Sequence, residues 1–82
     1  MFTNVPTDVT GTVTYLERMK NSRNGNPRWL ITINTGAETR SFLTKPNAMC
    51  AYKVYTGLVG KSIEARVLQY YGRPQIYAFN VN

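Results

Sequence analysis

The residues best suited to chemistry in this 82-residue chain are concentrated in residues 18–29, which read R-M-K-N-S-R-N-G-N-P-R-W. This stretch holds four of the ten cationic side chains and no carboxylate. Cations can bind phosphates and the ring of Trp29 could stack on a base, and a groove for single-stranded nucleic acid requires both features. The alternative is that the cations are solvated loop residues and that Trp29 points into the core. The four cations are Arg18, Lys20, Arg23 and Arg28.

The same stretch is expected to reverse the chain between two strands. Asn24-Gly25 supplies a positive φ at little cost, and Pro27 fixes the backbone angle that follows. Residues 8–20 and residues 28–35 alternate apolar or β-branched side chains with polar ones, which predicts strands on both sides of the turn. The basic residues should therefore lie at the tip of a hairpin.

The first and third predicted strands each carry one feature that bears on the shape of the sheet. Gly11, inside the first predicted strand, favours a bend or bulge that lets one strand serve both sides of a small barrel. Residues 39–44 predict a short third strand, and its buried face stays open because Phe42 and Leu43 lie on opposite faces.

The second half of the chain predicts one short helix or helical turn and a second hairpin. Residues 47–55 place Met49, Tyr52 and Tyr55 near one helical face. Residues 61–70 and 75–81 predict two strands joined by a turn at residues 71–74, and alternation puts Ile76 and Phe79 on opposite faces. The predicted order is β-β-β-α-β-β in one all-β domain of residues 1–82, with residues 1–7 as an N-terminal arm. We expect core or interface positions for Tyr15, Tyr52, Tyr55, Tyr77 and Phe79.

The charge balance favours a polyanionic partner. Ten Lys and Arg residues against four acids give a net charge of +6 and a pI near 9.8. The alternative is a basic surface that only maintains solubility. No run of eighteen or more apolar residues and no secretion signal is present, so we expect a soluble protein of the cytoplasm, or of the host cytoplasm if the chain is viral, with no membrane partner.

Catalysis is hard to build from these residue types. The chain has no histidine and a single cysteine, Cys50, which lies among apolar residues and is expected to be a buried, inert thiol. The four carboxylates are scattered singly, so neither a metal site nor a cofactor is predicted. We therefore expect a binding protein that is not an enzyme.

The order of elements resembles the oligonucleotide/oligosaccharide-binding fold (OB-fold), a five-stranded Greek-key barrel that binds ligands on strands two and three and on the loops after strands one and four. Residues 59–81, V-G-K-S-I-E-A-R-V-L-Q-Y-Y-G-R-P-Q-I-Y-A-F-N-V, are similar to the last hairpin of its nucleic-acid-binding members. The turn N-G-N-P-R-W is similar to that of small bacteriophage single-stranded-DNA-binding proteins. Many members end strand two with an aspartate and a Thr-Gly pair, whereas this sequence keeps only the pair, Thr35-Gly36. An SH3-like barrel is the rival fold.

The resemblance implies that the first hairpin and the last turn form opposed rims of one groove, floored by strands two and three. Trp29 shares a face with Ile31 and Ile33, which slightly favours the core for this ring. Lys45, Lys53 and Lys61 are expected to be solvated and away from the groove. The candidate cations are Lys20, Arg23, Arg28, Arg40 and Arg73, and the candidate stacking residues are Trp29, Phe42, Tyr70 and Tyr71.

The expected function is non-specific binding of single-stranded DNA in phage or plasmid replication or recombination. The alternative is a protein-interaction module, in a virion or replication complex, that uses the same barrel. An RNA-binding module of the same fold is a third interpretation, because no residue identifies a reader of the 2′-OH. A homodimer would increase avidity, since a domain of this size covers only a few nucleotides.

Overall fold

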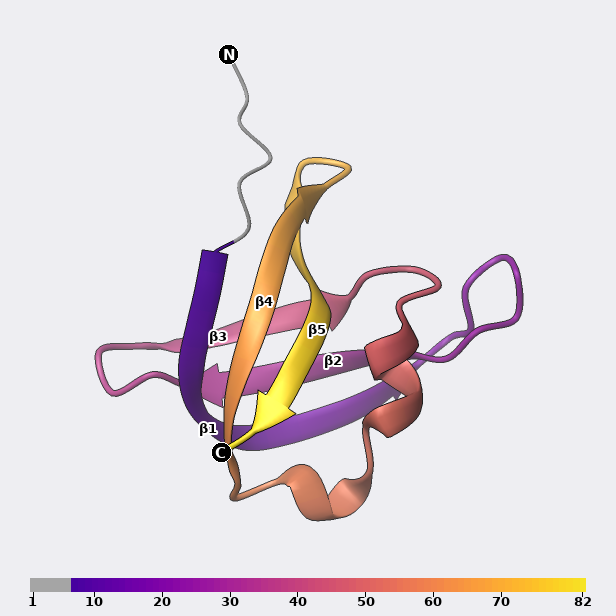
Figure 1. The fold of residues 1–82 in the computed structure, drawn as a ribbon. Helices are drawn as coiled ribbons and strands as arrows, with labels where there is room; N and C mark the ends of the chain where they lie inside the picture. The colour runs from indigo at the N-terminus through magenta and orange to yellow at the C-terminus, as the bar shows by residue number, and fades with distance from the viewer. Residues whose placement is uncertain (1–6) are drawn as a thin grey trace.

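The computed structural model describes residues 7–82 as five strands and two short 3-10 helices (Figure 1). All but the last residue of the predicted N-terminal arm lies outside the described residues. Neither helix of this part of the chain has the length and apolar character needed to span a membrane. The elements are β1 (Thr7–Met19), β2 (Arg28–Asn34), β3 (Thr39–Thr44), η1 (Met49–Lys53), η2 (Thr56–Leu58), β4 (Ser62–Tyr70) and β5 (Arg73–Val81).

The strands close into a barrel in the order β1-β2-β3-β5-β4, which confirms the predicted small five-stranded barrel. The first half of β1 pairs with β4 and its second half pairs with β2, and Figure 1 shows the bend between the two halves. A Cβ atom on Gly11 would lie 2.3 Å from the carbonyl oxygen of Asn34, so only glycine fits where β1 crosses β2. The register shift itself lies between Val13 and Tyr15.

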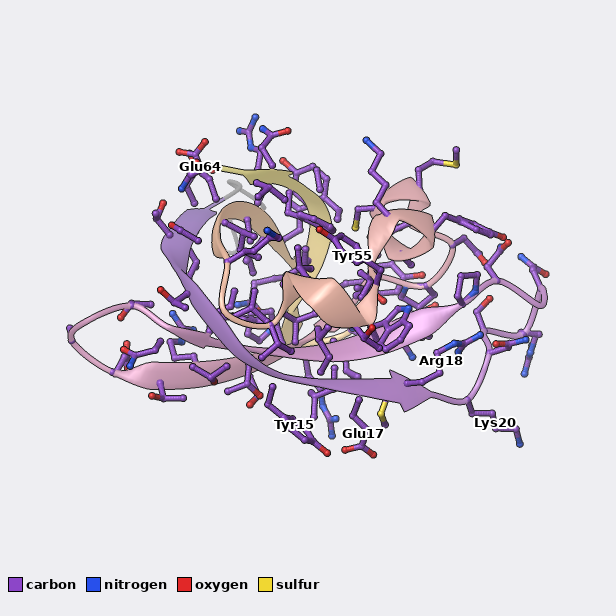
Figure 2. All side chains as sticks on the ribbon, turned by 90° about the horizontal axis from the view of Figure 1, so that it is seen from below. Tyr15, Glu17, Arg18, Lys20, Tyr55 and Glu64 are labelled. Carbon is purple, nitrogen blue, oxygen red and sulfur yellow. The ribbon has the colours of Figure 1, made fainter. Side chains whose placement is uncertain are left out.

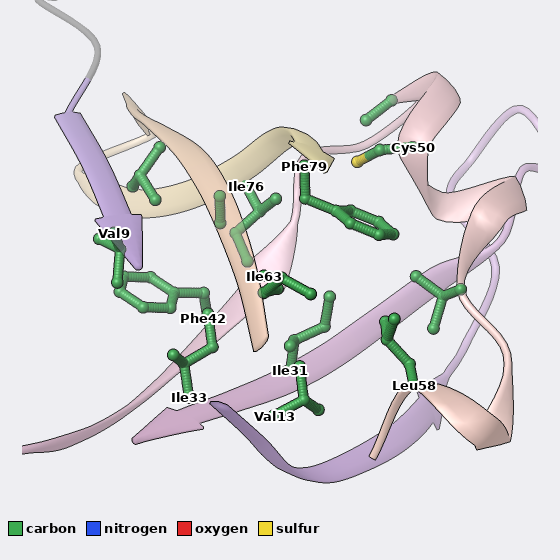
Figure 3. Close-up of a cluster of buried hydrophobic side chains, with 14 residues drawn as sticks. Val9, Val13, Ile31, Ile33, Phe42, Cys50, Leu58, Ile63, Ile76 and Phe79 are labelled. Carbon is green, nitrogen blue, oxygen red and sulfur yellow. The ribbon is translucent and has the colours of Figure 1, made fainter. Parts of the chain in front are cut away.

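The barrel interior is filled by side chains from all five strands (Figure 3). Phe42 is 2% exposed, which settles the face of β3: Phe42 points inward and Leu43 outward. On β5 the prediction of strict alternation is wrong. The pairing with β4 steps from Arg66–Ala78 to Val67–Ile76, so β5 has one extra residue there, and Ile76 and Phe79 are both buried.

The helical turn predicted within residues 47–55 is present as η1, a 3-10 helix, and a second 3-10 helix, η2, follows it. Small apolar side chains turn inward from this segment, and Figure 3 shows Cys50 beside Phe79 of β5. The three residues predicted to share a helical face are exposed: Met49 and Tyr52 lie three residues apart in η1, which places them on one outward side of the 3-10 helix. Their exposed fractions are 77% for Met49, 60% for Tyr52 and 51% for Tyr55.

Candidate nucleic-acid interface

A cleft of about 530 Å³ opens where three connections meet at one end of the barrel. The connections are the β1–β2 loop, the β3–η1 loop and the β4–β5 turn. No carboxylate of residues 7–82 lines the cleft. The structure thus brings together four of the predicted site residues, Arg23, Arg28, Tyr70 and Tyr71.

The β1–β2 loop is held in place by a polar network. The Ser22 hydroxyl and the Asn26 side-chain amide both donate hydrogen bonds to Oδ1 of Asn47, at 2.9 and 2.6 Å. The Tyr52 hydroxyl of η1 donates to Oδ1 of Asn26. Because the network joins the loop to the β3–η1 loop and to η1, the exposed side chain of Arg23 extends from a braced backbone.

Arg28 supports the barrel and lines the cleft at the same time. Its Nε and Nη2 atoms donate to the carbonyl oxygen of Thr44 at 3.2 and 3.1 Å, and Nη2 also donates to Oε1 of Gln75 at 2.8 Å. The Nη1 atom makes no hydrogen bond within residues 7–82, so this end of the guanidinium can receive an anion.

The β4–β5 turn presents an aromatic rim. Tyr71 and Gly72 have φ values of 51° and 75°, which is the pattern of a two-residue type I′ hairpin turn. The Tyr71 side chain is 87% exposed, and its ring meets the Tyr70 ring edge-on with centroids 4.6 Å apart. Nζ of Lys45 lies 4.5 Å from the centroid of the Tyr70 ring.

The prediction that Lys45 lies away from the groove is therefore wrong. The backbone amide of Lys45 donates to the carbonyl oxygen of Ile76 at 2.7 Å, where β3 runs parallel to β5. Lys45 was missed because only this long-range parallel pairing brings the end of β3 next to the last hairpin.

Trp29 belongs to the barrel wall. Its half-buried ring packs against the hydrophobic core, and the Arg18 guanidinium lies 5.8 Å from the ring centroid on the other side. Its backbone amide donates to the buried hydroxyl of Thr44 at 3.0 Å. Trp29 is not among the residues that line the cleft, in agreement with the core-facing alternative.

Phe42 and Arg40 do not join the cleft. The Phe42 ring fills the barrel interior, so no base can reach its face. The Arg40 guanidinium covers this ring at 4.8 Å from the centroid, beside a separate hollow of about 90 Å³. Both residues are therefore removed from the candidate interface.

The two remaining predicted residues lie beside the cleft. Lys20 is exposed at the start of the β1–β2 loop, and Arg73 pairs with Tyr70 across the turn. Arg73 also lines a groove of about 340 Å³ on the outer face of β2, β3 and β5. Among the described residues, the predicted floor of the site is thus lined by aliphatic side chains, and the apolar part of its lining consists of Met19, Leu30, Leu43 and Pro74.

The acidic side chains lie elsewhere. Within residues 7–82, the one ion pair is formed by Asp8 and Arg66, 3.3 Å apart on β1 and β4. The Tyr15 hydroxyl donates to Glu17, and this contact raises the pKa of Tyr15. Figure 2 shows Glu64 on the far side of the molecule from Lys20. The cations around the cleft are therefore not neutralised by acids of the described part of the chain.

No three His, Cys, Asp or Glu side chains of residues 7–82 gather where they could hold a metal ion. Burial raises the pKa of the Cys50 thiol to about 11, as expected for an inert core cysteine.

Comparisons with protein-family models, with curated proteins and with solved structures found no match to this chain. The resemblance to OB-fold nucleic-acid-binding proteins stays a prediction from the residues.

Proposed function

We propose that this protein binds single-stranded DNA without sequence specificity in the cleft between the β1–β2 loop and the β4–β5 turn. The observation that carries the proposal is Tyr71, whose ring is 87% exposed and whose φ is 51°. Type I′ turns favour Asn or Gly at this position, and a left-handed φ costs other residues about 1–2 kcal/mol. The fold gains little from such a ring, whereas a base could stack on its exposed face.

The charges around this ring suit a phosphate backbone. Arg23 and Arg28 line the cleft together with Tyr70, and Nζ of Lys45 lies over the Tyr70 ring. Each phosphate that a cation neutralises releases counterions from the nucleic acid, which strengthens binding at low salt. Rings and cations engage any sequence, because only contacts to base edges distinguish one base from another.

Phage or plasmid replication or recombination is the setting that we propose for this activity, and a homodimer would extend the length of strand covered. RNA is the competing ligand, since nothing in the cleft discriminates against a 2′-OH.

An assembly module is the second candidate function, and exposed apolar side chains between β3 and β4 favour it. Met49, Tyr52 and Tyr55 are all more than half exposed, and Val59 is 46% exposed. Such side chains are enriched in protein interfaces.

The test is a fluorescence anisotropy titration with a labelled oligo-dT of about thirty nucleotides, at about 50 and about 200 mM salt. We expect affinity to fall with salt, with log K decreasing by about 0.7 per log unit of salt for each phosphate contacted. Arg23→Ala should weaken binding and reduce this slope. Lys61→Ala, which removes an exposed cation outside the cleft, is the matched control. A folded protein that does not bind at low salt would refute the proposal and favour the assembly module.

A further inference from the structure

Gln75 is a buried polar side chain that connects the two rims of the cleft. It is 5% exposed and lies on β5, two residues after the β4–β5 turn ends at Arg73. Its Oε1 atom accepts a hydrogen bond from Nη2 of Arg28 at 2.8 Å, and its Nε2 atom donates to the carbonyl oxygen of Tyr70 at 3.0 Å. One side chain therefore contacts a cation of the first rim and the backbone of the second.

Backbone pairing between β3 and β5 is short at this end of the barrel. The parallel pairing of β3 with β5 consists of two residue pairs, Leu43–Gln75 and Thr44–Ile76. Pro74 has no N–H group, so it cannot donate the hydrogen bond that would continue the ladder toward the turn. The β4–β5 ladder continues to Tyr70–Arg73 and shapes the hairpin, but beyond Gln75 no β3–β5 pair connects this hairpin to β3 in the described residues. The two hydrogen bonds of the Gln75 side chain therefore add a direct link between the hairpin and Arg28 at the start of β2.

The same contacts fix the direction of the Arg28 guanidinium. Gln75 and the carbonyl oxygen of Thr44 take up the N–H groups of Nε and Nη2, which leaves Nη1 as the donor without a partner in residues 7–82. A guanidinium that is already oriented loses less side-chain entropy when it binds a phosphate.

We infer, on the basis of the proposed function, that Gln75 is the positioning residue of the cleft: it holds the Arg28 guanidinium and the Tyr70–Tyr71 rim at the spacing that one strand of nucleic acid requires. Gln75 itself touches no ligand. It adds to the affinity by fixing the geometry of both rims before the strand binds.

The test compares three variants in the oligo-dT titration and in amide NMR spectra of the protein alone. Gln75→Met keeps the length of the side chain and removes both hydrogen bonds. Gln75→Leu also removes both hydrogen bonds and adds no charge beside Arg28, so it serves as a second test if Gln75→Met is poorly folded. Gln69→Met changes an exposed glutamine of the same hairpin whose side chain makes no hydrogen bond in the described residues, and it is the control.

We expect Gln75→Met and Gln75→Leu to shift the amide signals of Tyr71 and Gly72 and to lower the affinity about tenfold, the equivalent of one hydrogen bond to a charged group. Gln69→Met should change neither. Unchanged affinity in folded Gln75 variants, or unmoved turn amides, would overturn the positioning role while leaving the proposed function intact. Failure of the unaltered protein to bind oligo-dT is a different outcome: it would refute the proposed function and, with it, the ligand that the positioning role serves.

Discussion

Replacing Tyr71 by asparagine should separate stability from binding. Asn-Gly is the favoured pair for a type I′ turn, and the backbone of residues 71 and 72 already has the two positive φ angles that this turn requires. The substitution therefore suits the hairpin better than the native tyrosine does. It also removes the most exposed aromatic ring that borders the cleft.

The expected change in stability is small because two effects oppose each other. Asparagine tolerates the left-handed conformation that costs a bulky residue about 1–2 kcal/mol. The edge-on contact between the rings of Tyr70 and Tyr71, with centroids 4.6 Å apart, is lost, and such pairs contribute about 0.5–1.5 kcal/mol. The two ranges combine to a free energy of unfolding between about 0.5 kcal/mol lower and about 1.5 kcal/mol higher than that of the unaltered protein.

Binding should respond far more strongly. Stacking of one base on an aromatic ring contributes about 1–3 kcal/mol, so Tyr71→Asn should weaken oligo-dT binding by about 5-fold to 150-fold. Tyr71→Phe keeps the ring and should bind within about twofold of the unaltered protein. Tyr55→Asn removes a tyrosine that is 51% exposed outside the cleft, and it should leave the affinity unchanged.

Urea denaturation measures the stability of each variant, and fluorescence anisotropy measures its affinity. A clear loss of stability in Tyr71→Asn with unchanged affinity would show that the ring serves the fold, contrary to the reasoning above. Equal losses of affinity in Tyr71→Asn and Tyr55→Asn would also contradict it, since a general loss of aromatic surface would then explain the effect.

Three further outcomes are expected. Gly11→Ala should lower the free energy of unfolding by at least about 2 kcal/mol, because its Cβ would lie 2.3 Å from the Asn34 carbonyl oxygen. The Cβ of Gly25→Ala meets no atom within 4 Å, so this control should cost only the strain of a φ of 83°. Phe42→Leu should lower the melting temperature yet leave the affinity for oligo-dT unchanged, because the ring is in the core. Burial raises the pKa of Cys50 from 9.0 to about 11, so the stability that the neutral thiol contributes is present below pH 9 and is lost as pH rises through 11. Urea denaturation between pH 9 and 11 should therefore show a smaller loss of the free energy of unfolding for Cys50→Ala than for the unaltered protein.

The strands could be predicted from the sequence because short-range alternation specifies them. The β-branched run of β1, the turn at Asn24-Gly25 and the Tyr71-Gly72 hairpin all lie where local pattern and turn chemistry place them. The extra residue in β5 could not be predicted, because it arises from pairing with β4 and no turn residue marks it. The same holds for η1 and η2, whose inward face is chosen by the fit of Cys50 and its neighbours against Phe79.

The rims of the candidate site were predicted better than its floor. Arg23 and Tyr71 lie in hairpin turns that can be predicted from their turn-forming residues. The barrel topology then brings the two turns to one cleft. The buried face of β3 could not be predicted because Leu43 is as apolar as Phe42, and the burial of the Phe42 ring rules out its predicted stacking role. The contacts of Lys45 and Gln75 depend on two residue pairs between β3 and β5, which are distant in the sequence and carry no local signal.

The most direct test of the proposed interface is an NMR titration of the isotope-labelled protein with unlabelled oligo-dT. Binding in the cleft should shift the amide signals of residues 20–28, 45–47 and 70–73, with the largest changes at Arg23, Tyr71 and Gly72. Signals of η1 and η2 away from Tyr52 should remain in place. Shifts concentrated on Met49, Tyr55 and Val59, or no shifts at low salt, would contradict a nucleic-acid site between the β1–β2 loop and the β4–β5 turn.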